Sequence, residues 1–160
     1  MFKIVSDAIN FNETRKELSN PRAGALVVFE GWVRNHHEGK DVLKLEYDAY
    51  ENLCVKEADK IEKECFDKFD ILQLNCVHRT GVCEIKDMAV WVGATAEHRG
   101  EAFRACEYYI DNLKVRLPIW KKEYFTEGEP IWVRCEECLK HAHGIHDNMH
   151  KKNLESIKTR

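Results

Sequence analysis

Two kinds of hydrophobic pattern alternate along the chain. Apolar, β-branched and aromatic residues run through positions 24–33, GALVVFEGWV, and predict a buried strand. Positions 42–50 then alternate, so that Leu43, Leu45 and Tyr47 point to one face of a half-buried strand. We expect the two strands to form an antiparallel pair, joined by the long polar loop between them.

Helical spacing replaces this alternation at positions 53–69. The apolar side chains there recur every three or four residues and form one stripe, made of Cys54, Ala58, Ile61, Cys65 and Phe69. Strand patterns return at 71–79 and 88–95, with a turn at Thr80 and Gly81 between them.

A second helix is expected to follow, with Thr95 as its N-cap and Pro118 as its end. Its apolar face would consist of Phe103, Cys106, Ile110, Leu113 and Leu117. Two short segments, 119–125 and 131–135, are then predicted to form a hairpin around the Gly-Glu-Pro turn at 128–130.

This order of strands and helices predicts an α+β fold in which the helices pack on a mostly antiparallel sheet. The length of 160 residues fits one domain. We assign that domain to residues 1–134 and separate from it a Cys- and His-rich C-terminal tail at 135–160.

Composition narrows the class of protein. The formal net charge of -3 gives no reason to expect nucleic acid or a membrane surface as partner. No apolar run approaches the roughly 20 residues that span a membrane, and the N-terminal segment lacks the features of a secretory signal. Seven cysteines, an odd number, are therefore expected to be reduced thiols in a cytoplasmic protein.

Cationic and imidazole side chains gather at two predicted element boundaries. Arg34, His36 and His37 follow the first long strand, where they could bind an anion or lie in an ordinary solvated turn. His98 and Arg99 begin the second helix, whose N-terminal N–H groups also favour an anion. A cation costs a little at that end of the helix dipole, so a bound anion would explain the pair; plain solvent exposure is the alternative.

A third group of cations flanks Pro118. Lys114 lies in the last turn of the predicted helix, and Lys121 lies on the strand that follows. Chain reversal at the proline could bring both ammonium groups to one pocket, where a lysine near another cation can act as a nucleophile or acid–base group. A lysine in a last helical turn is also ordinary compensation of the helix dipole.

The tail carries a possible metal site. Cys135 and Cys138 form a C-x-x-C pair that is closely followed by His141 and His143. Thiolate and imidazole are ligands that zinc prefers, so these four residues are candidate zinc ligands. Their spacing matches no standard zinc finger, and two ordinary thiols before a solvated terminus are the alternative.

Most of the chain, from about Gly24 to Val133, resembles the large-subunit family of molybdopterin synthase. The resemblance is carried jointly by VRNH at 33–36, HRTG at 78–81, EHR at 97–99 and LKVRLPIWKKE at 113–123. It implies an α/β hammerhead fold with an additional small antiparallel sheet. The Cys/His tail after Val133 departs from the family pattern.

The resemblance also implies an activity and partners. The family's large subunits are sulfurtransferases that take sulfur from the C-terminal thiocarboxylate of a small ubiquitin-like carrier ending in Gly-Gly. They pass it to cyclic pyranopterin monophosphate and so make the dithiolene of molybdopterin, with no cofactor required for catalysis. They form homodimers, and each protomer binds one carrier to give a heterotetramer.

Carried over residue by residue, the motifs imply that Lys114 and Lys121 are the catalytic pair. The positions that match the family's substrate pocket are Phe29, Arg34, His98, Arg99 and Glu123. Because that pocket lies at a dimer interface, some of these residues could serve the neighbouring protomer.

Two other functions stay open at this point. A non-catalytic module could hold a ubiquitin-like partner without performing chemistry, although the charged set would then have no role. A metal-responsive protein could use the tail as its sensor.

Overall fold

The computed structural model describes residues 1–134. Along the chain the elements are β1 (Phe2–Val5), α1 (Phe11–Glu17), β2 (Ala25–Trp32), β3 (His36–His37), β4 (Lys40–Ala49), α2 (Glu51–Lys68), β5 (Gln73–Arg79), β6 (Gly81–Glu84), β7 (Met88–Ala96), α3 (Arg99–Arg116), β8 (Ile119–Phe125) and β9 (Ile131–Arg134). None of the helices in this range is long and apolar enough to cross a membrane.

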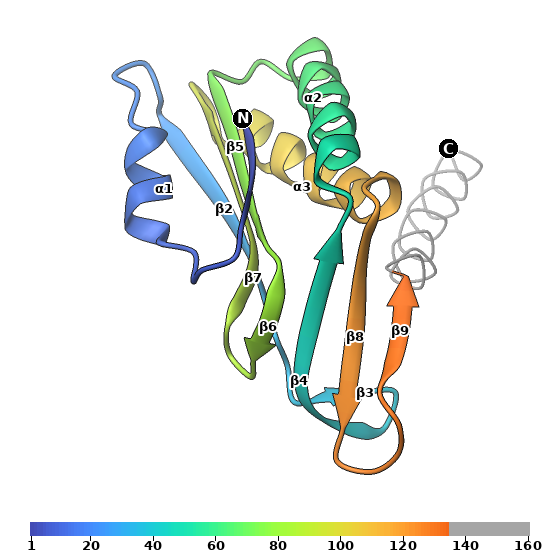
Figure 1. The fold of residues 1–160 in the computed structure, drawn as a ribbon. Helices are drawn as coiled ribbons and strands as arrows, with labels where there is room; N and C mark the ends of the chain where they lie inside the picture. Colours follow the sequence, from blue (N-terminus) through green and yellow to red (C-terminus); the bar gives the residue numbers. More distant parts are fainter. Residues whose placement is uncertain (135–160) are drawn as a thin grey trace, which may run out of the picture.

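The first sheet has the strand order β1-β5-β7-β2. β1 runs parallel to β5, and the other neighbours are antiparallel. Figure 1 shows α2 and α3 on one side of this sheet and α1 on the other. The predicted α+β class, with helices packed on a mostly antiparallel sheet, is therefore confirmed.

The second sheet has the order β3-β4-β8-β9, and β6 also pairs with β4. It is antiparallel throughout, and the predicted β8–β9 hairpin is present, with Gly128 at φ +97° in its turn. The expected pairing of β2 with β4 is wrong, because β2 pairs with β7 while β4 pairs with β8. Glu38 and Gly39, both at positive φ, close a tight turn that folds β3 onto β4 and so starts a new sheet.

The main core lies between the first sheet and the two long helices. The stripe predicted for α2 is buried at Cys54, Ala58, Ile61 and Cys65. On α3 the buried residues are Ala102, Ala105, Cys106, Tyr109, Ile110 and Leu113. Phe103 was expected in this face, but it falls at the edge of the stripe and is 59% exposed.

A second correction concerns β4. The strand contains an irregularity between Val42 and Lys44, where its register against β8 shifts. A bulge of this kind reverses the alternation of inward and outward side chains. Val42 is consequently buried and Leu43 is 53% exposed, whereas Leu45 stays in the core as predicted.

The start of α3 also differs from the prediction. Thr95 is not an N-cap: it lies in β7, whose pairing with β2 continues as far as Ala96. His98, with extended backbone angles, is the N-cap, and no side chain caps the helix there. The end is as predicted, because Leu117 before Pro118 adopts the extended conformation that proline imposes on its predecessor.

Candidate active site

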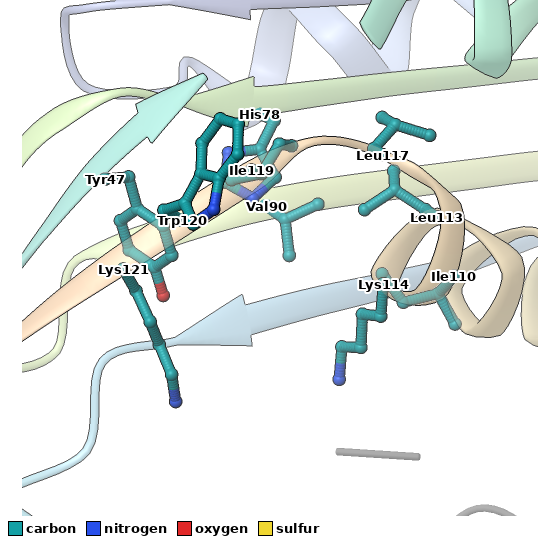
Figure 2. A pocket seen from close by; sticks show the side chains of 10 residues that line it. All are labelled: Tyr47, His78, Val90, Ile110, Leu113, Lys114, Leu117, Ile119, Trp120 and Lys121. Atoms are coloured by element: carbon teal, nitrogen blue, oxygen red, sulfur yellow. The ribbon is translucent and has the colours of Figure 1, made fainter. Parts of the chain in front are cut away.

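Lys114 and Lys121 line one pocket, as the chain reversal at Pro118 suggested. The pocket is otherwise walled by Tyr47, His78, Val90, Ile110, Leu113, Leu117, Ile119 and Trp120. In Figure 2 the two lysine side chains extend toward the same side of it. The structure therefore brings together the two ammonium groups on which the predicted chemistry depends.

Local structure explains why they meet. Lys114 lies in the last turn of α3, and Lys121 is the third residue of β8, so one reversal separates them. The ammonium nitrogen of Lys114 lies 5.7 Å from the centroid of the Phe29 ring on β2, within the range of a cation–π contact. Phe29 thus touches a catalytic candidate, as its predicted place beside the pocket requires.

Glu123 is the negatively charged partner of Lys121. Its side chain is only 2% exposed, and one carboxylate oxygen lies 2.7 Å from the Lys121 ammonium nitrogen. The other lies 2.7 Å from Nδ1 of His37 on β3. Burial alone would raise the pKa of Glu123, but hydrogen bonds from Lys121 and His37 outweigh it, and the pKa is lowered.

His78 on β5 is a pocket residue that the sequence analysis did not select. It is 5% exposed, and its Nδ1 donates to the carbonyl oxygen of Arg79 over 2.8 Å. Burial lowers its pKa to about 4, so the ring is neutral near pH 7. The HRTG motif at 78–81 contains His78 and could have indicated it. The hydrophobic pattern alone only placed it in a predicted strand.

Three predicted substrate residues are not among those that line this pocket. Arg34 is exposed between β2 and β3, and His98 and Arg99 are exposed at the start of α3. Lys114 lies fifteen residues further along that helix, which separates its backbone from that of Arg99 by about 22 Å at 1.5 Å per residue. One copy of the chain therefore does not bring His98 and Arg99 to the lysine pair.

The pocket of one copy is also small. It encloses about 60 Å³. Its lining includes Lys114 and Lys121 but none of Arg34, His98 and Arg99. A substrate phosphate would therefore find no guanidinium group among the walls that surround the two lysines here.

The cysteines of the described region offer no reactive thiol. Cys54, Cys65, Cys76, Cys83 and Cys106 are all buried and unbridged. Burial is the main cause that raises the pKa of each, to about 11 for Cys54 and about 12 for Cys65. Cys54, Cys65 and Cys106 were predicted on the apolar faces of the two long helices, and all five thiols are packed as small hydrophobic side chains.

No metal-binding cluster of His, Cys, Asp or Glu occurs within residues 1–134. The candidate zinc ligands Cys135, Cys138, His141 and His143 lie outside the described residues. The zinc hypothesis therefore stays a prediction from sequence.

Fold and pocket together define an α+β protein with a pocket that two lysines line. The chain matches the family model described as MoaE protein over residues 4–116. It therefore belongs to the MoaE protein family.

Two relatives and one solved structure illustrate the match. The chain is 38% identical over 124 residues to the molybdopterin synthase catalytic subunit of Pyrococcus abyssi, covering 78% of this chain and 83% of that protein. It is 38% identical over 131 residues to molybdopterin synthase catalytic subunit 1 of Mycobacterium tuberculosis, covering 82% of this chain and 88% of that protein. A crystal structure of Staphylococcus aureus molybdopterin synthase superposes with a TM-score of 0.78 at 37% identity, covering 82% of this chain and 96% of that chain.

A more distant structure shares the fold. It comes from a protein–protein complex of subunits 1 and 2 of molybdopterin-converting factor from Helicobacter pylori. The TM-score is 0.69 at 24% identity, with 83% of this chain and 90% of that chain covered.

Proposed function

We propose that the chain is the catalytic subunit of a molybdopterin synthase. It transfers sulfur from the C-terminal thiocarboxylate of a small ubiquitin-like carrier to cyclic pyranopterin monophosphate, and two such transfers make the dithiolene. The observation that carries this proposal is the pocket shared by Lys114 and Lys121 in a chain of the MoaE family.

The lysines divide the chemistry between them. Lys121, held by the buried Glu123 carboxylate, presents a fixed positive charge that orients the thiocarboxylate and stabilises negative charge developing on its oxygen. Lys114, against the face of Phe29, serves at the reacting carbonyl as a general acid–base group or as a transient acceptor of the carrier's C-terminus. Apolar walls strengthen both interactions by excluding water.

A second copy of the chain completes the site. His98 and Arg99 are exposed far from Lys114 of their own copy, and neither of them lines the pocket of that copy. A symmetric homodimer can place His98 and Arg99 of one protomer beside the lysine pair of the other. Arg99 and Arg34 then supply the bidentate guanidinium groups that suit a substrate phosphate, and His98 supplies a further hydrogen-bond donor.

The carrier is the second partner. Its Gly-Gly end is slim enough to enter a narrow channel toward Lys114, because no side chain obstructs it. The Helicobacter pylori protein of the same fold was solved together with its other subunit, and a corresponding complex here would be a heterotetramer of two large subunits and two carriers.

Reconstitution tests the proposal. The purified chain is mixed with a thiocarboxylated carrier and cyclic pyranopterin monophosphate, and the dithiolene product is measured. We expect product with the wild-type chain and none above background with Lys114→Ala, although that variant still binds the carrier on a sizing column. Normal product formation by Lys114→Ala would remove the mechanism, and carrier binding without product by the wild-type chain would instead favour a non-catalytic module.

A further inference from the structure

His37 does not line the lysine pocket, but it contacts Glu123, the carboxylate that is paired with Lys121. It lies on the two-residue strand β3, at the tip of the hairpin with β4, and is separated from Glu123 by 86 positions in sequence. Its ring nitrogen nevertheless lies 2.7 Å from Oε2 of Glu123, while Oε1 of the same carboxylate lies 2.7 Å from the ammonium nitrogen of Lys121. Each carboxylate oxygen therefore has its own partner.

We propose that His37 is a positioning residue for sulfur transfer: it fixes the Glu123 carboxylate, and through it the ammonium group of Lys121. The proposal rests on the proposed function, because it gives Lys121 the role assigned to it there. It adds a residue for which the family resemblance implied no role.

Burial makes this chain of contacts sensitive to the loss of His37. The Glu123 side chain is 2% exposed, Lys121 15% and His37 21%, so water has little access to replace a missing donor. Without His37, only the contact of Oε1 with the Lys121 ammonium group restricts rotation of the carboxylate about its last side-chain bond, so the carboxylate and the ammonium group can move together. Held at both oxygens, the carboxylate has one orientation.

The backbone explains how the hairpin holds its place. His37 pairs with Lys40 across the tight turn, and β4 pairs with β8 so that Leu45 lies opposite Glu123. The hairpin tip is thereby attached to the same sheet as the catalytic candidate. His36, its neighbour, is exposed, and its ring forms a hydrogen bond with the side chain of the adjacent Asn35, which makes it a matched control.

Three variants separate positioning from a merely structural role. His37→Leu removes the donor. His37→Asn keeps a donor atom bonded to Cγ, in the place of Nδ1. His36→Leu makes the same apolar change one residue away, outside the chain of contacts.

Two readouts are measured on each variant in the complete complex. The first is kcat and KM for the pterin precursor with thiocarboxylated carrier. The second needs no activity: the labelling rate of Lys121 by an amine-reactive reagent, measured by peptide mass spectrometry relative to Lys122 on the same strand.

We expect His37→Leu to lower kcat about tenfold, with KM changed by no more than about twofold, because the lost contact acts on a catalytic group. The labelling ratio of Lys121 to Lys122 should rise several-fold. His37→Asn should restore both values to within about twofold of wild type, and His36→Leu should leave the labelling ratio unchanged. If His37→Leu does not fold, His37→Gln, whose donor is displaced by one bond, replaces it with the same expectation.

The proposal is overturned if loss of His37 leaves both kcat and the labelling ratio at their wild-type values. It is equally overturned if His37→Asn behaves like His37→Leu, or if kcat falls while the labelling ratio does not change. Failure of the proposed function looks different: the wild-type complex then makes no product, while the labelling ratio still depends on His37.

Discussion

At the scale of single residues, the site balances two positive charges against one negative charge. Lys114 and Lys121 line the same pocket, and of these two lysines it is Lys121 whose ammonium nitrogen lies 2.7 Å from a Glu123 oxygen. Lys121 is therefore the paired and fixed ammonium group, while Lys114 rests on the Phe29 ring and keeps its donors for a reacting group. This asymmetry is the physical basis for assigning the two lysines different roles.

His78 gives a prediction about stability and pH. Its pKa is lowered from 6.5 to about 4 by burial, so the unfolded chain takes up a proton below about pH 6.5 while the folded chain does not until about pH 4. The free energy of unfolding should then fall with decreasing pH in this window, by at most about 1.4 kcal/mol per pH unit from this group. Urea denaturation at pH 7 and pH 5 measures the slope.

The expected result is a smaller loss of stability between pH 7 and pH 5 for His78→Leu than for wild type. The exposed His36→Leu serves as control and should retain the wild-type loss. The window stays above 4.5, the ordinary pKa of Glu123, whose lowered value contributes only at more acidic pH. Equal losses in wild type and His78→Leu would contradict the buried, neutral state of His78.

The sequence predicted which site residues meet when they lie close together along the chain. It did not predict contacts between site residues on distant elements. One proline between a helix and a strand was enough to suggest that Lys114 and Lys121 meet. The contact from His37 to Glu123 spans two strand pairings and a hairpin turn, so no local pattern could indicate it. His78 was hidden for the same reason, because its neighbours in the pocket come from other elements.

At the scale of elements, α3 and β8 build the pocket, and α1 supports the sheet from its other face. Leu18, at the end of α1, is 2% exposed and packs where β7 has a glycine. A Cβ atom added at Gly93 would lie 2.5 Å from Cδ1 of Leu18 and still closer to the Trp91 ring. Close approach of α1 to the sheet therefore depends on Gly93.

Gly93→Ala should destabilise the protein by about 1–3 kcal/mol, because buried Leu18 and Trp91 have to move. Gly100→Ala is the control, since a Cβ there meets only the Arg104 side chain at 3.5 Å, within the first turn of α3. It should be neutral or slightly stabilising, as alanine favours a helix. Chemical denaturation measures both, and equal stability of the two variants would contradict this packing account.

Elements with long periodic patterns were predicted well. The stripe of α2 and the end of α3 follow directly from residue spacing and from Pro118. Errors arose where pairing between strands decided the outcome: β7 continues past Thr95 because β2 pairs with it, and the bulge in β4 exposes Leu43. β1 and α1, which the sequence analysis did not predict, are short and depend on contacts with β5 and with the sheet.

At the scale of the whole molecule, the account requires two copies of the chain. Arg34, His98 and Arg99 do not line the lysine pocket of their own copy, although all three match the family's substrate positions. The sequence could name these residues but not the copy that they serve, because that depends on a surface between protomers.

Mixing two inactive variants tests the shared site. Lys114→Ala and His98→Ala homodimers should each be nearly inactive. After subunit exchange, half of the dimers are mixed, and one of the two sites in each is intact, so about a quarter of wild-type activity should return. Product formation after exchange is the measurement.

The control mixture combines Lys114→Ala with Lys121→Ala. Because both lysines belong to the same protomer's pocket, no mixed dimer has an intact site, and no activity should return. Equal recovery in the two mixtures, or none in either after exchange is verified by mass spectrometry, would contradict the shared site.

In the proposed mechanism Lys114 and Lys121 act as one unit in one pocket, and a double-mutant cycle on the sulfur-transfer rate measures their coupling. The rates of wild type, Lys114→Ala, Lys121→Ala and the double variant are compared, with Lys122→Ala as the neighbouring control. We predict at least about a 100-fold loss for each single variant, with the double variant within about tenfold of the slower one and Lys122→Ala near wild type. Losses that multiply in the double variant, or a Lys121→Ala rate equal to that of Lys122→Ala, would contradict the account.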